Sequence, residues 1–174
     1  MLPVAVAAER TGPSALEEEV VHLFDQLRAP VLRYLLSLGL AVQDGEEIAQ
    51  EVFLALFRHL RMGKSRANVR GWVFRVAHNL GLKRREAARR YAEPQEIHAH
   101  DPAPDPEVQF ANAQRQDRML AVLRALAEQD RQCLYLRAEG LRYREIAKVL
   151  EISLGAVSNS LARSLAKIAE VSEK

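Results

Sequence analysis

The stretch from residue 44 to residue 90 constrains the fold most, because its charge reverses while its helical pattern continues. It reads DGEEIAQEVFLALFRHL at its acidic start and NVRGWVFRVAHNLGLKRREAARR at its basic end. Apolar residues recur three and four positions apart in both segments. This spacing predicts two amphipathic helices, each of which buries one apolar stripe and leaves a charged face in solvent.

The first of these helices is expected to start at Asp44, where Glu47 completes a capping box for the free backbone N–H groups. Its core-facing stripe holds Ala49, Val52, Phe53, Leu56 and Leu60. The opposite face holds Glu47, Gln50, Glu51 and Arg58, with Leu54 among them. Leu54 is either a single exposed leucine on a solvated face or the centre of a docking face for a basic or amphipathic partner helix.

The second helix is expected to start at Asn68, a residue type that caps helices well. Its buried stripe holds Val69, Val73, Val76 and Leu80. Trp72 borders this stripe, which favours a place in the core. Residues 61–90 contain ten Lys or Arg and one acidic residue, a net charge of +9. That density, with Trp72, Phe74 and Tyr91 interleaved, suits a phosphate backbone with bases stacked beside it.

The rest of the chain carries the opposite charge. The 174 residues have a net charge of +2, while residues 1–60 carry −5 and residues 91–174 carry −2. One basic segment on an otherwise acidic chain indicates a polyanionic partner. Hydrophobic residues make up 48% of the sequence and Pro and Gly are few, which predicts an all-α protein.

No cofactor, metal or catalytic site is expected, because the sequence has no Gly-rich phosphate loop and no metal-spaced cluster. The single cysteine, Cys133, excludes a disulfide framework and is expected to be a small core residue. His98 and His100 lie beside Asp101 in a Pro-rich segment. They are interpreted as solvated residues, since a zinc site needs more ligands at firm spacing.

Residues 1–13 are expected to form a flexible tail that fits neither a signal peptide nor a membrane span, so a cytoplasmic protein without membrane insertion is predicted. Residues 14–91 are expected to form a first domain of four helices. Ser14 and Glu17 form a capping box, Pro30 should kink or restart the helix, and Gly39 should end it. The apolar positions of the first helix are Val20, Val21, Leu23, Phe24 and Leu27.

Residues 92–105 are Pro-rich and have no helical period, which predicts a linker that leaves two domains weakly coupled. Residues 106–174 are expected to form the second domain. Its first helix should open at Asp105 and Pro106 and run to about Ala127. Asp130 should cap the next helix, which should end at Gly140.

The segment LRYREIAKVLEISLGAVSNSLARSLAKIAE has helix-turn-helix spacing. A short helix carries Ile146, Ala147 and Leu150, residues 151–153 form a turn, and Ser153 caps a last helix. The predicted buried stripe of that last helix holds Val157, Leu161, Leu165 and Ile168. Among its exposed early positions, Asn159 is the side chain that can pair with an adenine edge.

The acidic and basic segments contain the residues Gln50, Glu51, Val52, Phe53, Trp72, Phe74, Arg75, Ala77 and Asn79. In this order they resemble the promoter-melting domain of bacterial sigma factors, above all the extracytoplasmic-function (ECF) group of the sigma-70 family. The sequence departs from that pattern at Glu47, where aspartate is usual, and at His78, where arginine is usual. A third departure is Gly71, before the tryptophan.

The helix-turn-helix segment is similar to the upstream-promoter domain of the same group. The matching residues are Glu139, Gly140, Tyr143, Arg144, Glu145, Ile146, Ala147, Ile152, Ser153, Gly155 and Val157. Arg142 replaces the usual capping serine, and Glu151 stands where a turn glycine is common. Ser158 and Ser160 stand where Lys and Arg are usual. Together the two resemblances cover about residues 17–90 and 118–170.

The resemblance implies a sigma factor that docks on core RNA polymerase, directs it to promoter DNA and is held by an anti-sigma factor. The residues implied to bind polymerase are Asp44, Glu47, Gln50, Glu51 and Leu54. Those implied to bind DNA are Arg61, Lys64, Arg66, Asn68, Arg75, Asn79, Lys83, Arg84, Arg85, Tyr143, Arg144, Ser158, Asn159 and Arg163. Such a protein is not itself an enzyme.

The alternative is a helix-turn-helix regulator whose first domain only dimerises or senses a signal. A helix-turn-helix segment cannot separate the two, because both classes contain one. The acidic face around Leu54 and the +9 segment favour the sigma factor.

Overall fold

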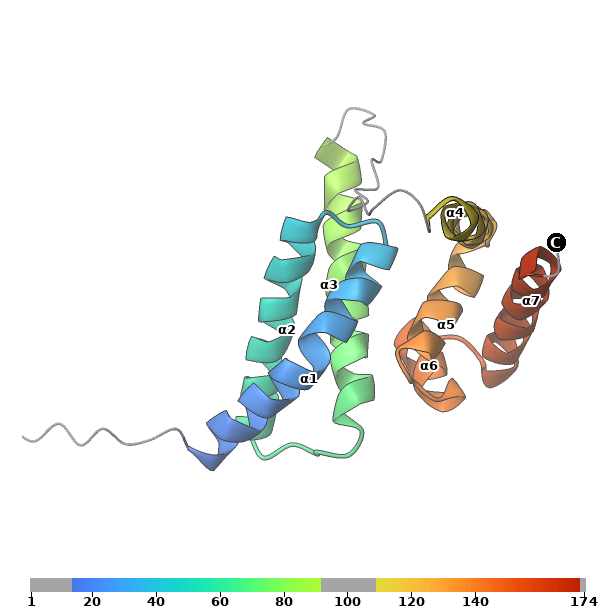
Figure 1. Ribbon diagram of the computed structural model, residues 1–174. Helices are drawn as coiled ribbons and strands as arrows, with labels where there is room; N and C mark the ends of the chain where they lie inside the picture. The colour runs from blue at the N-terminus through green and yellow to red at the C-terminus, as the bar shows by residue number, and fades with distance from the viewer. Residues whose placement is uncertain (1–13, 92–108, 173–174) are drawn as a thin grey trace, which may run out of the picture.

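The computed structural model describes residues 14–91 and 109–172, and within these ranges it contains seven α-helices and no strand. They are α1 (Ala15–Ser37), α2 (Val42–Arg61), α3 (Val69–Tyr91), α4 (Gln109–Ala125), α5 (Glu128–Ala138), α6 (Tyr143–Leu150) and α7 (Leu154–Ser172). The all-α prediction is confirmed. The expected tail, the linker and the helix start at Asp105 and Pro106 lie outside the described residues. Figure 1 shows α1–α3 as one bundle, here called the N-terminal bundle, beside α4–α7, the C-terminal half.

Helix α1 starts with the predicted capping box, in which Glu17 N donates to Ser14 Oγ at 3.3 Å and Ser14 N donates to Glu17 Oε2 at 2.6 Å. The helix then runs through Pro30 without a break, so the N-terminal bundle has three helices and not four. Pro30 removes one backbone donor, but Leu27 and Val31 on either side are buried and anchor the helix in the core. Its end before Gly39, which has a φ of 88°, is confirmed.

Helix α2 begins earlier than predicted. Its N-cap is Ala41, which makes no side-chain capping bond, so Asp44 lies in the first turn and the Asp44–Glu47 capping box is wrong. Leu40 is buried just before the helix and fixes where the chain enters it. The Asp44 carboxylate accepts a hydrogen bond from Arg84 instead. The predicted core stripe from Ala49 to Leu60 is buried throughout.

Helix α3 begins with the predicted side-chain cap, in which Gly71 N donates to Asn68 Oδ1 at 3.1 Å. Asn68 has a φ of 56°, a left-handed conformation that asparagine tolerates better than most residues. The cap also explains Gly71, because a Cβ at that position would lie 2.4 Å from Asn68 Nδ2. A side chain at position 71 would therefore displace the cap.

In the C-terminal half, α5 starts at Glu128 after Ala127, so Asp130 is not the predicted cap. Asp130 is buried and binds Arg163 of α7. The cap at Ser153 is confirmed, since Ala156 N donates to Ser153 Oγ at 3.1 Å. Helix α4 ends at Ala125, two residues before the approximate end predicted from the sequence.

The buried stripe of α7 differs from the prediction at Leu165, which is exposed. The residues of α7 that face the core are Val157, Ser160, Leu161 and Ser164, all buried. Ser164 Oγ donates to the carbonyl of Ser160 at 2.9 Å, so its hydroxyl is satisfied inside the helix. Leu165 lies beside this stripe and is exposed.

The two halves are in contact. Helix α3 packs on α6, and α1 packs on α5. Buried residues of both halves belong to one hydrophobic cluster that includes Tyr34 and Phe74 on one side and Leu136 and Leu141 on the other. The halves that the Pro-rich segment predicts to be weakly coupled are therefore packed against each other in this structure.

Candidate functional site

The exposed side of α2, here called the α2 face, presents Glu47, Gln50, Glu51 and Leu54, as the sequence predicts. Leu54 keeps 59% of its surface exposed and borders an apolar groove of about 440 Å³. The groove is lined by Glu17, Val20, Val21 and Phe24 of α1 and by Gln50, Phe53, Leu54 and Phe57 of α2. Leu54 is therefore part of an open apolar surface and not an isolated leucine.

Sequence reasoning missed the contribution of α1 to this groove. The sequence indicates Val20, Val21 and Phe24 only as apolar positions of the first helix, and Val21 is exposed. Phe24 packs edge-on against Phe53, with ring centroids 4.9 Å apart. Five apolar positions within the eight residues 20–27, about two helical turns, are more than one core stripe needs, and that excess is the signal that could have identified a second apolar surface.

Arg84 of α3 belongs to the α2 face in this structure. Its Nη1 donates to Asp44 Oδ1 at 2.5 Å and to Glu47 Oε2 at 3.1 Å. The hydrogen bonds to Glu47 and Asp44 raise the pKa of Arg84 above its ordinary value. One guanidinium predicted to hold phosphate thus neutralises two carboxylates predicted to meet polymerase, while Glu51 stays exposed and unpaired within the described residues.

The loop of residues 62–68 joins α2 to α3 and is held by its own polar contacts. His59 Nε2 lies 3.1 Å from the carbonyl oxygen of Ser65, and Ala67 N donates to Ser65 Oγ at 3.1 Å. Arg66 binds Glu19 of α1 through Nε and Nη2 at 3.0 to 3.2 Å. These contacts fix the loop between the ends of two helices.

Within this loop region, the side chains of Arg61 and Lys64 are exposed and make no hydrogen bond or ion pair in the described part of the chain. Trp72 is partly buried against the core, as its pattern favoured, and its ring centroid lies 4.6 Å from that of His59. The Asn68 side chain is occupied by its capping bond. Arg61 and Lys64 are thus the loop-region cations best placed to meet an anion.

The basic side of α3, here called the α3 face, is divided between free and engaged side chains. Asn79 and Lys83 are exposed and make no hydrogen bond or ion pair among the described residues. Arg75 approaches Glu151 at 3.7 Å, and Arg85 binds Glu128 at 2.5 Å. Both of these partners come from the C-terminal half, so part of the α3 face is covered.

His78, where the family resemblance expects arginine, is buried under the α3 face. Its Nδ1 lies 2.9 Å from the hydroxyl of Tyr34. Burial lowers the pKa of His78, and the nearby charge of Arg85 lowers it further. Burial also raises the pKa of the Tyr34 hydroxyl, so this hydroxyl keeps its proton in the hydrogen bond with the ring.

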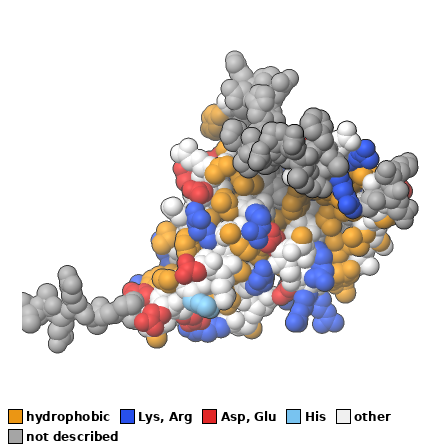
Figure 2. All heavy atoms as spheres, in the orientation of Figure 1, with side chains coloured by type: hydrophobic (Ala, Val, Ile, Leu, Met, Phe, Trp, Pro, Cys, Tyr) orange, Lys and Arg blue, Asp and Glu red, His pale blue; other side chains and the backbone are white. Residues whose placement is uncertain are grey.

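On the helix-turn-helix surface, Tyr143, Arg144, Ser158 and Asn159 are exposed and unpaired within the described residues. Arg163 is not free: Nε and Nη2 donate to the buried Asp130 at 3.0 and 2.6 Å. These bonds lower the pKa of Asp130. Figure 2 shows Lys and Arg side chains gathered around the end formed by α6, and acidic side chains where α1 begins.

Ser160, one of the departures from the usual basic pattern, is buried and accepts a hydrogen bond from Gln129 Nε2 at 3.1 Å. Ser160 therefore replaces the usual basic residue at a buried position between α5 and α7, and not on the outer surface of α7.

Across residues 14–91 and 109–172, no cluster of three or more His, Cys, Asp or Glu side chains could hold a metal ion. Cys133 is buried, as predicted, and burial raises the pKa of its thiol. Within the same ranges, every helix is too short or too polar to cross a bilayer.

Two family models match this chain: Sigma-70 region 2 over residues 23–91, and Sigma-70, region 4 over residues 116–168. The first match covers the N-terminal bundle and the second most of the C-terminal half. The chain belongs to the sigma-70 family, in its ECF group.

The ECF RNA polymerase sigma factor SigE of Mycolicibacterium smegmatis is 29% identical over 162 residues, covering 89% of this chain and 62% of SigE. The chain thus spans less than two thirds of the length of SigE. The RNA polymerase sigma factor YlaC of Bacillus subtilis is 24% identical over 152 residues, covering 84% of this chain and 88% of YlaC.

Among solved structures, the sigma factor RpoE from Bartonella quintana, in complex with the anti-sigma factor NepR, superposes with a TM-score of 0.65. The match has 15% sequence identity and covers 90% of this chain and 98% of RpoE. At this identity the likeness supports the fold of the chain.

Proposed function

We propose that this chain is a dissociable sigma subunit of RNA polymerase, which docks on the core enzyme and directs it to promoters in the cytoplasm. The observation that carries the proposal is the pairing of an open apolar groove with acidic rims on α2 and a basic face on α3 of the same bundle. A helix-turn-helix regulator needs the C-terminal half but gives no reason for these two faces.

In this proposal Gln50, Glu51 and Leu54 contact polymerase, together with the α1 side of the groove. An amphipathic helix of the core enzyme would insert apolar side chains into the groove and place basic ones against Glu51. Asp44 and Glu47 contribute through their shared bond to Arg84, which orients them.

Promoter DNA is assigned to three groups of residues. The loop of residues 62–68, with Arg61 and Lys64, and the α3 residues Asn79 and Lys83 would hold the melted strand. Tyr143 and Arg144 would contact the upstream duplex backbone, and Ser158 and Asn159 its base edges. Arg75 and Arg85 become available only if the C-terminal half moves away.

The domain boundaries we propose are residues 14–91 for polymerase docking and promoter melting and residues 106–174 for upstream recognition. Residues 1–13 are the tail and residues 92–105 the linker. The protein catalyses no reaction itself and needs no cofactor. Because the solved relative RpoE is bound by an anti-sigma factor, we include an anti-sigma factor among the partners of this chain.

The test is co-purification of the chain with core RNA polymerase, followed by run-off transcription from duplex and pre-melted templates. A sigma subunit gives a stable complex and promoter-dependent transcripts from the duplex. A chain that binds duplex DNA but neither joins the core enzyme nor starts transcripts is the alternative regulator.

A further inference from the structure

Glu19 of α1 binds the loop of residues 62–68 from outside the two helices that the loop joins. Arg66 Nε donates to Glu19 Oε1 at 3.0 Å and to Oε2 at 3.2 Å, and Arg66 Nη2 donates to Oε2 at 3.1 Å. Two nitrogens of one guanidinium thus meet both oxygens of one carboxylate, a geometry that fixes direction as well as distance. The hydrogen bonds to Glu19 raise the pKa of Arg66 above its ordinary value.

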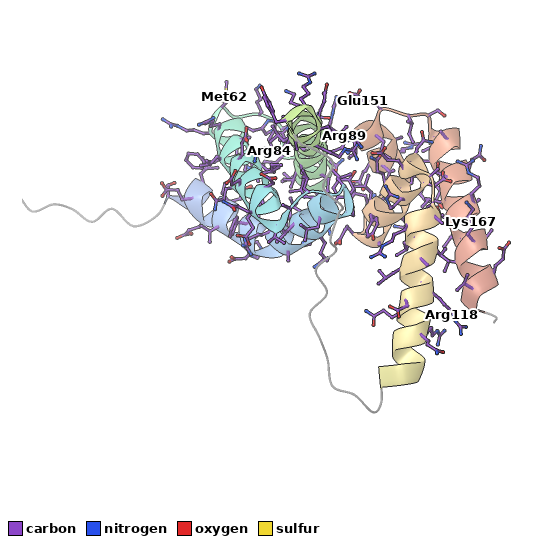
Figure 3. The ribbon with its side chains drawn as sticks, turned by 90° about the horizontal axis from the view of Figure 1, so that it is seen from above. Met62, Arg84, Arg89, Arg118, Glu151 and Lys167 are labelled. Carbon is purple, nitrogen blue, oxygen red and sulfur yellow. The ribbon has the colours of Figure 1, made fainter. Side chains whose placement is uncertain are left out.

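Solvent surrounds this loop, so packing does not orient its side chains. Residues 61–68 are all exposed, and the Arg66 side chain keeps 53% of its surface accessible. Figure 3 shows Met62, which opens the loop, at the outer edge of the N-terminal bundle and away from the C-terminal half. An arginine without a partner in such a place samples many rotamers. The direction of the Arg66 side chain is therefore set by Glu19.

An arginine can bind a second anion while it holds a carboxylate, because its planar guanidinium carries five N–H donors. The bonds to Glu19 use the edge formed by Nε and Nη2, while Nη1 makes no bond among the described residues. The edge formed by Nη1 and Nη2 has the fork shape that binds phosphate. Arg61 and Lys64 are exposed in the same region, so an anion that reaches the loop meets three cations.

We infer that Glu19 is a positioning residue for promoter DNA: it holds Arg66 so that the free edge of the guanidinium binds a phosphate of the melted strand. The inference rests on the proposed function, which places the melted strand on this loop. It gives α1 a part in DNA binding, although the sequence assigns that role to no residue of α1 and Glu19 is itself acidic.

The charge of Glu19 separates this role from two simpler ones, because both of them predict the opposite effect. A carboxylate near DNA repels phosphate, and a carboxylate that occupies an arginine competes with phosphate for it. In either case, removing the charge of Glu19 tightens DNA binding. In the positioning role, removing it weakens DNA binding, since Arg66 loses the partner that directs it.

The decisive variant is Glu19→Gln, measured in the holoenzyme with the pre-melted promoter template of the run-off test. Binding of this template should weaken by roughly two- to fivefold, the factor that corresponds to measured energies of exposed ion pairs. Binding of a duplex that contains only the upstream part of the promoter should stay unchanged, because the C-terminal half is proposed to contact that part. A general loss of folding would weaken the binding of both DNAs.

Glu18→Gln is the matched control, because Glu18 is the preceding residue of α1, is exposed, and has a carboxylate that makes no bond among the described residues. It removes the same charge from the same helical turn and should leave binding of the pre-melted template unchanged or slightly tighter. Circular dichroism checks that both variants are folded, and pull-down checks that both join core polymerase.

Two variants of Arg66 test whether Glu19 acts through this side chain. Arg66→Lys keeps the positive charge but lacks a planar fork with a second edge, so it should weaken binding of the pre-melted template as Glu19→Gln does. In an Arg66→Gln background, Glu19→Gln should have no further effect, because the two residues form one contact.

The inference is overturned if Glu19→Gln binds the pre-melted template as tightly as Glu18→Gln or more tightly. It is also overturned if Glu19→Gln weakens binding equally with and without Arg66. Retention of core enzyme by the wild-type chain is a separate readout that tests the sigma assignment, so a failure of the positioning role is distinct from a failure of the proposed function.

Discussion

The α2 face and the α3 face lie on the same three-helix bundle, yet one is open and the other is partly covered. The α2 face exposes Leu54 beside an apolar groove, and its carboxylates Asp44 and Glu47 are already bound by Arg84. The α3 face has its arginines Arg75 and Arg85 engaged by the C-terminal half. In the proposed function this difference separates docking on a protein from holding DNA within one small bundle, and the following changes test that separation.

The largest effect is expected on the open face. Leu54→Asp places a charge at the mouth of the apolar groove and should weaken binding to core polymerase by at least about 2 kcal/mol, roughly 30-fold. Val42→Asp is the control, since Val42 lies on the same helix and is exposed to a similar degree, at 57%. The measurement is pull-down of core enzyme at equal helicity, and equal retention of both variants would remove Leu54 from the docking surface.

The next effect concerns the start of the covered helix. Gly71→Ala should destabilise the fold by about 1–2 kcal/mol even though alanine favours helices, because its Cβ would displace the Asn68 cap. Chemical denaturation measures the change. Asn68→Ala removes the same cap from the other side, so adding Gly71→Ala to it should cost much less. Additive losses in the double variant would show that the two residues act independently.

A pH effect is expected from His78 beneath the covered face. Its pKa is lowered in the fold, so when pH falls through about 6.5 the unfolded chain takes up a proton that the folded chain does not. Folding stability should therefore be full above this range and fall by up to about 1.4 kcal/mol per pH unit below it.

Urea denaturation at several pH values between about 7.5 and 5.5 measures this dependence. His78→Gln should lose it, whereas the exposed His22→Gln, which alters only a contact with Gln26, should keep it. The same slope in both variants would mean that His78 titrates in the fold as it does in the unfolded chain.

The smallest effect distinguishes two neighbours that the sequence assigns to one role. Lys83 is exposed and unpaired within the described residues, whereas Arg84 is bound to Asp44 and Glu47. Lys83→Ala should flatten the salt dependence of holoenzyme binding to promoter DNA by about one unit of slope. Arg84→Ala should leave that slope nearly unchanged and weaken docking on the core enzyme. Equal slopes in the two variants would place both residues on the same face.

Local patterns predicted the local structure well. The caps at Ser14, Asn68 and Ser153 follow from a side-chain acceptor and a free N–H three residues apart, and the structure has all three. The core stripe of α2 follows from helical spacing, because each helix in a bundle buries one apolar face against its neighbours. The family assignment, which rests on matched residues in order, is confirmed as well.

Long-range pairing could not be predicted in this way. Asp44 fits a capping pattern as well as it fits an ion pair, and only the approach of Arg84 decides between them. Leu165 fits the period of α7, but Ser160 and Ser164 hold buried positions beside Leu161, and Leu165 is exposed. Arg33 and Glu139 are 106 residues apart, and sequence spacing carries no information about their contact.

The bonds that hold the loop of residues 62–68 have a consequence for the entropy of DNA binding. Ordering one residue of backbone costs about 1–2 kcal/mol at room temperature, and a loose loop would lose that amount when it closes on a melted strand. Here the contacts of His59, Ser65, Arg66 and Asn68 order the loop when the chain folds. In the proposed function, a single strand that binds this loop therefore loses its own conformational entropy but does not have to order the loop as well.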